Sequence, residues 1–289
     1  MKNELVIKNK TPLKYNARLS NNFKSNIFFK EEHSSIGQSY KYRLINDIIK
    51  NYGNDVCIIC YPLHIKLFAE FLNKNKKNIY IYLIKSTNRI KNKYNNVTIH
   101  DNDITINKTI EKALTFCKEN NVELIDTIFN PNNSFNNIYN EINNQLGKKL
   151  PIDYVIVSGC HYDILLSTLN FFKSYENTTV ICTRLSQQKK IINTNYAFPT
   201  KKHLNKYKNY KVVNINEEEY IDYIIDTYIN DSYIMEYTSA LVGSSLKKIQ
   251  DLIIGKNVVC IINDNNNNID TIINILNKYK TKSISSIKN

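Results

Sequence analysis

One short spacing in the sequence could bind a metal ion or carry out redox chemistry. Cys57 and Cys60 form a C-x-x-C motif, and His64 follows four residues later. However, residues 56–60 are a continuous apolar run that predicts a buried strand, and side chains three positions apart on a strand point to opposite faces. The two sulfurs therefore could not share one ion. We expect two buried thiols, which together with the other scattered cysteines indicate a reducing compartment and a cytoplasmic protein.

Positive charge is the second feature that could indicate a function. The formal net charge is +13, which could serve an anionic partner. Positive charge is densest at residues 73–78 and 201–211, and the second segment interleaves lysine with tyrosine, as sites for single-stranded nucleic acids can. The whole chain, however, is rich in Asn, Lys, Ile and Tyr, a bias that an AT-rich coding sequence would produce regardless of function. We favour a solvated loop at 201–211, and nucleic-acid binding stays as an alternative.

Short apolar runs alternate with amphipathic, helix-length segments along the chain. Apolar strands of this kind are buried on both faces, which favours parallel sheets with crossover helices and hence an α/β fold. The predicted strands are at residues 27–30, 55–60, 78–84, 96–100, 154–157, 179–183, 210–214 and 257–262. The predicted helices are at residues 42–51, 65–73, 109–120, 135–146, 164–173, 217–228, 237–253 and 269–279. The apolar runs are too short to span a bilayer and the first residues lack a signal core, so we expect no membrane segment.

The segment from Thr11 to Arg43 carries a family resemblance. It contains Thr11-Pro12-Leu13, Leu19-Ser20, Asn26-Ile27-Phe28-Phe29-Lys30, Glu32, and Ser39-Tyr40-Lys41-Tyr42-Arg43. Their order and spacing resemble the opening of the threonine/serine dehydratase group of fold-type II pyridoxal-phosphate enzymes, in the tryptophan synthase beta superfamily. The resemblance implies a two-lobed α/β architecture of mostly parallel sheets flanked by helices. It places a larger lobe at residues 1–43 and 134–289 and a smaller lobe at 44–133.

The resemblance also implies roles for individual residues. In the family, the lysine of S-[FY]-K-x-R binds pyridoxal phosphate covalently, so Lys41 is the implied catalytic lysine. Such a lysine holds the aldehyde of the cofactor, exchanges with the substrate amine and moves protons at Cα. The implied cofactor-binding residues are Lys41, Ser158, Gly159, Cys160, His161 and Asn263. The implied substrate-binding residues are Ser39, His64 and Glu236.

Three of the implied cofactor contacts depart from the family pattern. Leu63 stands where an asparagine would contact the ring hydroxyl, and Asn263 replaces the serine that faces the pyridine nitrogen. The phosphate loop has a single glycine, Gly159, followed by Tyr162 and Asp163, whereas such a loop relies on several glycines and on backbone N–H groups at a helix N-terminus. Asp163 would repel a phosphate, and it could equally cap an ordinary strand-to-helix turn.

Three functional hypotheses follow. The first is a pyridoxal-phosphate-dependent ammonia-lyase of the dehydratase type, which acts on a hydroxyamino acid through Lys41. The second is a pseudoenzyme that retains the fold for binding or regulation and has lost the cofactor. The third is a basic nucleic-acid-binding protein. If the protein is active, the resemblance implies a small amino acid as its partner, at a site without metal. It also implies a homodimer, the assembly common in the family.

Overall fold

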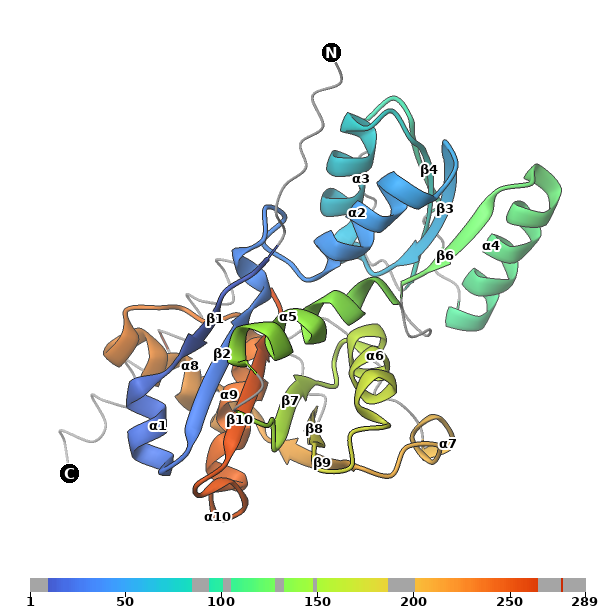
Figure 1. Ribbon diagram of the computed structural model, residues 1–289. Coiled ribbons are helices and arrows are strands. Elements are labelled where there is room, and N and C mark those ends of the chain that lie inside the picture. The colour runs from blue at the N-terminus through green and yellow to red at the C-terminus, as the bar shows by residue number, and fades with distance from the viewer. Residues whose placement is uncertain are drawn as a thin grey trace. The chain divides into compact units, whose positions relative to one another are not determined.

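The protein divides into two compact units. The computed structural model describes residues 10–84, 94–100, 105–127, 133–147, 150–186, 201–264 and 277. Unit 1 comprises Met1–Tyr40 and Asn136–Asn289, and unit 2 comprises Lys41–Phe135. Each unit has its own sheet, covered by helices (Figure 1). The expected α/β fold with parallel sheets is therefore confirmed.

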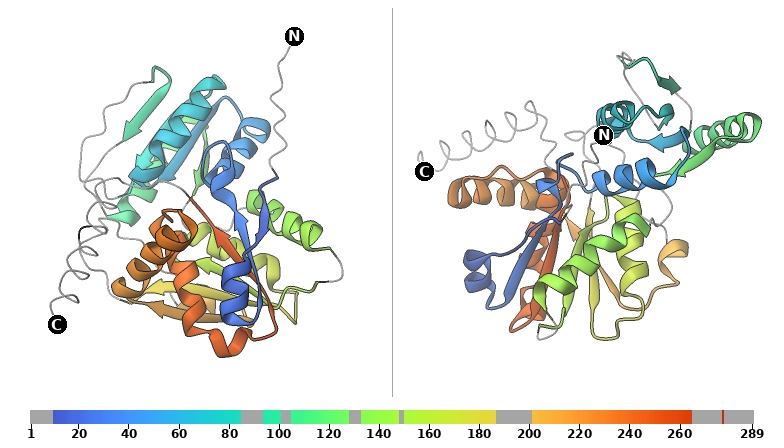
Figure 2. Two further views of the ribbon diagram at one scale, coloured as in Figure 1. Left: turned by 90° about the vertical axis from the view of Figure 1, so that its left-hand side faces the viewer. Right: turned by 45° about the horizontal axis from the view of Figure 1, so that its top comes forward.

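Unit 1 is built on a six-stranded sheet with the order β1-β2-β10-β7-β8-β9. All neighbouring strands are parallel except β1 and β2, which are antiparallel. The bounds are β1 Leu13–Tyr15, β2 Asn26–Glu31, β7 Tyr154–Ser158, β8 Thr179–Leu185, β9 Tyr210–Ile215 and β10 Asn257–Ile262. Strand β2, near the start of the chain, thus lies beside β10, the last described strand, blue beside red in Figure 2.

Helices complete unit 1. Their bounds are α1 Ala17–Phe23, η1 Glu32–Ser34 (3-10), α5 Asn136–Leu146, α6 Tyr162–Phe172, α7 Lys201–Leu204, α8 Glu217–Asp231, α9 Tyr237–Lys248 and α10 Gln250–Ile253. Apolar residues of α8 and α9 share one core with Val258, Cys260 and Ile262, which are alternate residues of β10. Helix α6 packs on β7 and β8 and against α5. Every residue of β10 is buried, which explains its near-continuous apolar sequence.

Unit 2 is built on a four-stranded parallel sheet with the order β5-β4-β3-β6. Its elements are α2 Lys41–Asn51, β3 Asp55–Cys60, η2 Pro62–His64, α3 Ile65–Lys74, β4 Asn78–Leu83, β5 Val97–His100, α4 Ile106–Asn120, β6 Glu123–Asp126 and η3 Asn133–Phe135. On β3, Cys57 packs in a cluster with Cys117 of α4. Burial raises the pKa of Cys57, and it raises the pKa of Cys60 to about 12. The prediction of two buried thiols is confirmed, because both are fully buried and free.

Some short elements differ from the predicted pattern. Strands β1 and β6 and helices α1 and α7 were not predicted, because three to seven residues are too few to show a clear period. The helix expected at 237–253 is interrupted at Ile249, which separates α9 from α10. The helix expected at 269–279 lies outside the described residues except for Asn277. Among the described helices, none is long and apolar enough to cross a membrane.

Candidate ligand site at the ends of β7 and β10

The ends of two neighbouring strands bring most of the predicted site residues of unit 1 together. Strands β7 and β10 are parallel partners, so their carboxyl ends lie at the same edge of the sheet. Ser158 is the last residue of β7, and residues 159–161 connect it to α6. Asn263 and Asp264 follow β10 directly, and both are buried. In open α/β sheets this edge is where ligands usually bind.

The segment before Lys41 is attached to the same edge. Ser39 is fully buried and forms an isolated antiparallel bridge with Asp264. The backbone N–H of Tyr40 donates to the carbonyl of Asn263 at 3.1 Å. The hydroxyl of Tyr40 donates to Oδ1 of Asp163 at 2.9 Å. Ser39 and Tyr40, the first two residues of the S-[FY]-K-x-R segment, therefore belong to this end of the sheet.

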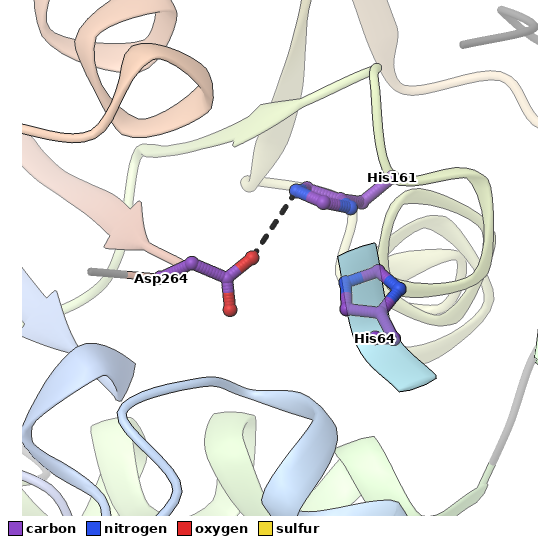
Figure 3. A group of neighbouring side chains, drawn as sticks. All are labelled: His64, His161 and Asp264. Atoms are coloured by element: carbon purple, nitrogen blue, oxygen red, sulfur yellow. Dashed lines mark ion pairs between the residues drawn. The ribbon is translucent and has the colours of Figure 1, made fainter. Parts of the chain in front are cut away.

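His161 and Asp264 form a buried pair in this region. His161 Nε2 lies 3.4 Å from Asp264 Oδ2 (Figure 3), and neither residue is more than 3% exposed. The same nitrogen is 3.2 Å from Oγ1 of Thr238. Since Asp264 and Thr238 both approach Nε2, these three residues do not have the arrangement of a hydrolase triad, in which the acid and the nucleophile use different ring nitrogens.

Glu236 caps the start of α9 beside this pair. Its Oε2 accepts hydrogen bonds from the backbone N–H groups of Thr238 at 2.9 Å and Ser239 at 3.2 Å, and from the Thr238 hydroxyl at 2.5 Å. Burial, and then the charge of Asp264, raise the pKa of Glu236 to about 8, although the cap hydrogen bonds oppose the shift. Glu236 therefore has a structural role as an N-cap, and its carboxyl is mostly protonated near neutral pH.

Asp163 lies in the first turn of α6. It is 2% exposed, so its carboxylate is inside the unit, where it accepts the hydrogen bond from Tyr40. The N-cap residue of α6, His161, makes no side-chain cap hydrogen bond. Asp163 is also the acidic residue of this turn, where a negative charge complements the helix dipole.

Backbone donors in the connection between β7 and α6 are already in use. The N–H of Gly159 donates to the carbonyl of Thr183 at 2.8 Å. The N–H of Cys160 donates to Oγ of Ser158 at 3.3 Å. Burial raises the pKa of the Cys160 thiol to about 12, so this cysteine is not a ready nucleophile. A phosphate cradle would need such N–H groups to point at the ligand.

The side chain of Asn263 has polar atoms that are buried without a hydrogen-bond partner. The residue is fully buried, and neither its amide nitrogen nor its amide oxygen has a partner within the described part of the chain. Its backbone is held, because its N–H donates to Oγ of Ser239 at 3.1 Å. An unpaired buried amide costs free energy unless a ligand or a water molecule satisfies it.

Lys41 and His64 belong to unit 2. Lys41 is the first residue of α2 and is only 2% exposed, and its ammonium donates to the carbonyl of Thr127 at 2.7 Å. The hydroxyl of Thr127 in turn donates to the carbonyl of Ile59 in β3 at 2.8 Å. His64 ends η2 and is 1% exposed. Lys41 is thus not the surface lysine that its position at a helix start would suggest without the family resemblance.

The basic segment at 201–211 is part of unit 1. It contains α7 and the start of β9, and Tyr207 within it is 7% exposed. A site for single-stranded nucleic acid would need aromatic faces open to the bases. The burial of Tyr207 favours a folded connection over such a platform.

Asp264 and Thr238 were not among the predicted site residues. Both followed predicted positions in the sequence, Asn263 and Glu236, but only the fold shows that they share contacts with His161. Unit 1 therefore places three buried carboxylates, those of Asp163, Glu236 and Asp264, at the ends of β7 and β10 and at the starts of α6 and α9. Carboxyl groups buried this close together can hold a proton, as the raised pKa of Glu236 indicates.

Comparison with known proteins finds a threonine dehydratase by sequence, and a threonine deaminase and a serine racemase by structure. The biosynthetic L-threonine dehydratase IlvA of Staphylococcus aureus is 22% identical in a match that covers 90% of this chain and 70% of that protein. The processed form of threonine deaminase isoform 2 from Solanum lycopersicum matches with a TM-score of 0.71 and 17% identity, over 93% of this chain and 82% of that one. Serine racemase from Dictyostelium discoideum matches with a TM-score of 0.70 and 15% identity, over 90% and 93% of the two chains. No protein-family model matches the chain.

Proposed function

We propose that this chain, which has the fold of the fold-type II pyridoxal-phosphate enzymes, is a pseudoenzyme of the threonine/serine dehydratase group. It retains the fold to bind a small ligand or to regulate, and it does not hold pyridoxal phosphate through the loop that grips the phosphate in the family. The observation that carries the proposal is the buried carboxylate of Asp163 inside the equivalent loop.

Electrostatics support the proposal. A phosphate group carries between one and two negative charges near neutral pH, and a like charge close by in a site of low dielectric opposes its binding strongly. Asp163 is buried in the first turn of α6, where that phosphate would need to lie. The N–H groups of Gly159 and Cys160 are bonded to protein oxygens and are not presented to a ligand. The residues present therefore do not fit the cofactor's phosphate, and we assign no reaction step to the cofactor.

One observation favours the alternative of an active lyase. Lys41 is retained at the position of the cofactor lysine, and it is buried instead of solvated. In that alternative the substrate is a hydroxyamino acid, and Ser39, His64 and Glu236 are the residues that the resemblance assigns to it. The proposed pseudoenzyme explains the altered loop, whereas the lyase explains Lys41.

A test for a covalent lysine adduct separates the two functions. The full-length protein is mixed with pyridoxal phosphate, its visible absorption is recorded, and the mixture is reduced with borohydride for peptide mass analysis. We expect no adduct at Lys41. The matched control is Lys77→Ala, because Lys77 is another buried lysine of unit 2 whose ammonium donates to backbone carbonyls. An adduct that Lys77→Ala keeps and Lys41→Ala loses would refute the pseudoenzyme and establish the cofactor lysine.

The wider expectations from the resemblance are also proposals. We propose that units 1 and 2 correspond to the larger and smaller lobes of the family. We further propose a cytoplasmic protein whose partner is a small amino acid or a related amine, and a homodimer as its assembly. The burial of Tyr207 is our reason for leaving nucleic acid out of this proposal.

A further inference from the structure

Unit 2 contains a cavity of about 350 Å³, which is lined by residues of β3, β6 and α4 and by Tyr52, the residue that follows α2. We propose that this cavity binds a small organic amine, with the hydrocarbon part against isoleucine and leucine side chains and the ammonium group at Asp126. All of its described lining residues belong to unit 2, whereas the site at the ends of β7 and β10 belongs to unit 1. The inference therefore does not depend on the proposed function.

The size and the walls of the cavity suit a small molecule with an apolar body. Five of its seven described lining residues are isoleucine or leucine. Ligand pockets begin at about 300 Å³, and an engineered apolar cavity of about 150 Å³ already holds benzene. Leu114 lines the cavity and is 52% exposed, so this apolar wall can be reached from solvent. A ligand that covers Leu114 would remove its apolar surface from water, which favours binding.

The charge at the cavity is negative. Asp126 is the one charged residue among the described lining residues, although the chain as a whole has a formal net charge of +13. Burial, and then the charges of Asp47 and Glu123, raise the pKa of Tyr52, which is the other polar lining residue. Two further carboxylates are therefore close enough to act on the wall of the cavity, and their sign favours a cationic ligand.

One cation near the cavity is held by the protein backbone. The ammonium of Lys77 donates to the carbonyls of Tyr52 and Gly53 at 2.7 Å and 2.9 Å, and its single charge offsets only part of the charge of three carboxylates. A carboxylate offers about four acceptor sites, so Asp126 can accept from a ligand ammonium in addition to the contacts that it has within the protein. The ring of Tyr52 can add a cation–π contact. An amine is therefore favoured over an acid of the same size.

The test compares three probes of similar size, which are phenethylamine, 2-phenylethanol and phenylacetate. The full-length protein is first freed of any pyridoxal phosphate, because the amine could otherwise react with the aldehyde of that cofactor. Binding is then measured by ligand-detected NMR titration. We expect saturable binding of phenethylamine, at least about fivefold tighter than binding of the alcohol, and weaker binding of phenylacetate than of either.

Two variants test whether the amine binds in the cavity. Asp126→Asn removes the charge and should weaken phenethylamine binding about fivefold, the size expected for a partly exposed ion pair. Its matched control is Glu70→Gln, which removes the same charge from a partly exposed ion pair of α3 and should have no effect. Leu114→Trp fills the cavity from its exposed side and should abolish binding. Leu252→Trp makes the same change at another exposed leucine, in α10, and should leave binding unchanged.

Thermal unfolding identifies the folded variants, and Leu114→Phe takes the place of Leu114→Trp if that variant does not fold. Losses of binding in both cavity variants, with both controls equal to the wild type, support the inference. It is overturned by a wild type that does not bind phenethylamine, by an alcohol that binds as tightly as the amine, or by folded cavity variants that bind like the wild type. Equal losses in Glu70→Gln would show only an effect of net charge and overturn it too.

A second copy of the chain is the competing occupant of the cavity. A wild-type dimer that Leu114→Trp dissociates and Leu252→Trp does not, measured by size-exclusion chromatography with light scattering, would show that a partner subunit covers the cavity, and it would overturn the inference. The proposed function fails on a different readout, which is a Lys41 adduct in the unmodified protein.

Discussion

The substitution Glu236→Gln should change how the stability of the protein depends on pH. Glu236 caps α9 through Oε2, and the amide oxygen of glutamine can accept the same hydrogen bonds from Thr238 and Ser239. The pKa of Glu236 is about 8 in the folded protein, against an ordinary value of 4.5. The substitution therefore removes a titrating group and preserves the cap.

The sign and the size of the pH effect on stability follow from this difference between the folded and ordinary pKa of Glu236. The folded chain binds the Glu236 proton more tightly than the unfolded chain, so the protonated carboxyl stabilises the fold. This contribution is fully present below pH 4.5 and is lost as the pH rises to about 8. At about 1.4 kcal/mol per pH unit, the full loss is on the order of 4–5 kcal/mol. The glutamine variant does not titrate and should keep its stability over the same range.

Urea unfolding of both proteins at intervals between pH 5 and pH 9 measures the effect. We expect Glu236→Gln to be close to the wild type at the acid end and more stable than the wild type by several kcal/mol at the alkaline end. Glu219→Gln is the control, because Glu219 belongs to the partly exposed capping box of α8. Parallel curves for wild type and Glu236→Gln would refute the reasoning, since they would mean that Glu236 ionises alike in the folded and unfolded chains.

Two further substitutions test the packing of unit 1 by urea unfolding. Gly243→Ala would place a Cβ atom 2.1 Å from the ring of Tyr223, so it should lower the free energy of unfolding by roughly 1–3 kcal/mol. The same substitution in a Tyr223→Ala background should not have this effect. Unchanged stability of the single variant would contradict the packing. Lys30→Met should lower the free energy of unfolding by about 3–5 kcal/mol, because the fully buried Lys30 pairs with Glu141 at 2.6 Å. Lys14→Met removes an exposed ion pair and should lower it by less than about 1 kcal/mol. Equal losses of stability in the two variants would contradict the role of burial.

The buried apolar strands were predictable, whereas the short strands β1 and β6 were not. Strands β3 and β10 are buried along nearly their whole length, so burial produces the continuous apolar runs from which they were predicted. Strand β6 has four residues, of which Glu123 and Asp126 are charged, and neither alternation nor a run distinguishes it from a loop. Its place in the sheet comes from pairing with β3, which is a tertiary contact.

The candidate site was predictable only where a residue follows a recognisable strand or motif. Asn263 was predicted because it comes directly after β10 and matches a family position. The contact of Asp264 with His161 depends on β10 lying beside β7, and no local signal carries that strand order. Lys41 is one of many basic residues in a chain with 39 lysines and arginines, so composition could not reveal its burial. Only the family resemblance singled it out.

The pairing of β2 with β10 also affects how the chain emerges from the ribosome. Asn26 in β2 bonds to Asn257 in β10, 231 positions later, whereas unit 2 is one continuous stretch between them. Unit 2 is therefore fully synthesised long before unit 1 can close its sheet. During that time β2 has β1 on one side only, and its other edge is open until β10 has been made. That open edge of the nascent chain is a point at which mispairing with other strands has to be avoided.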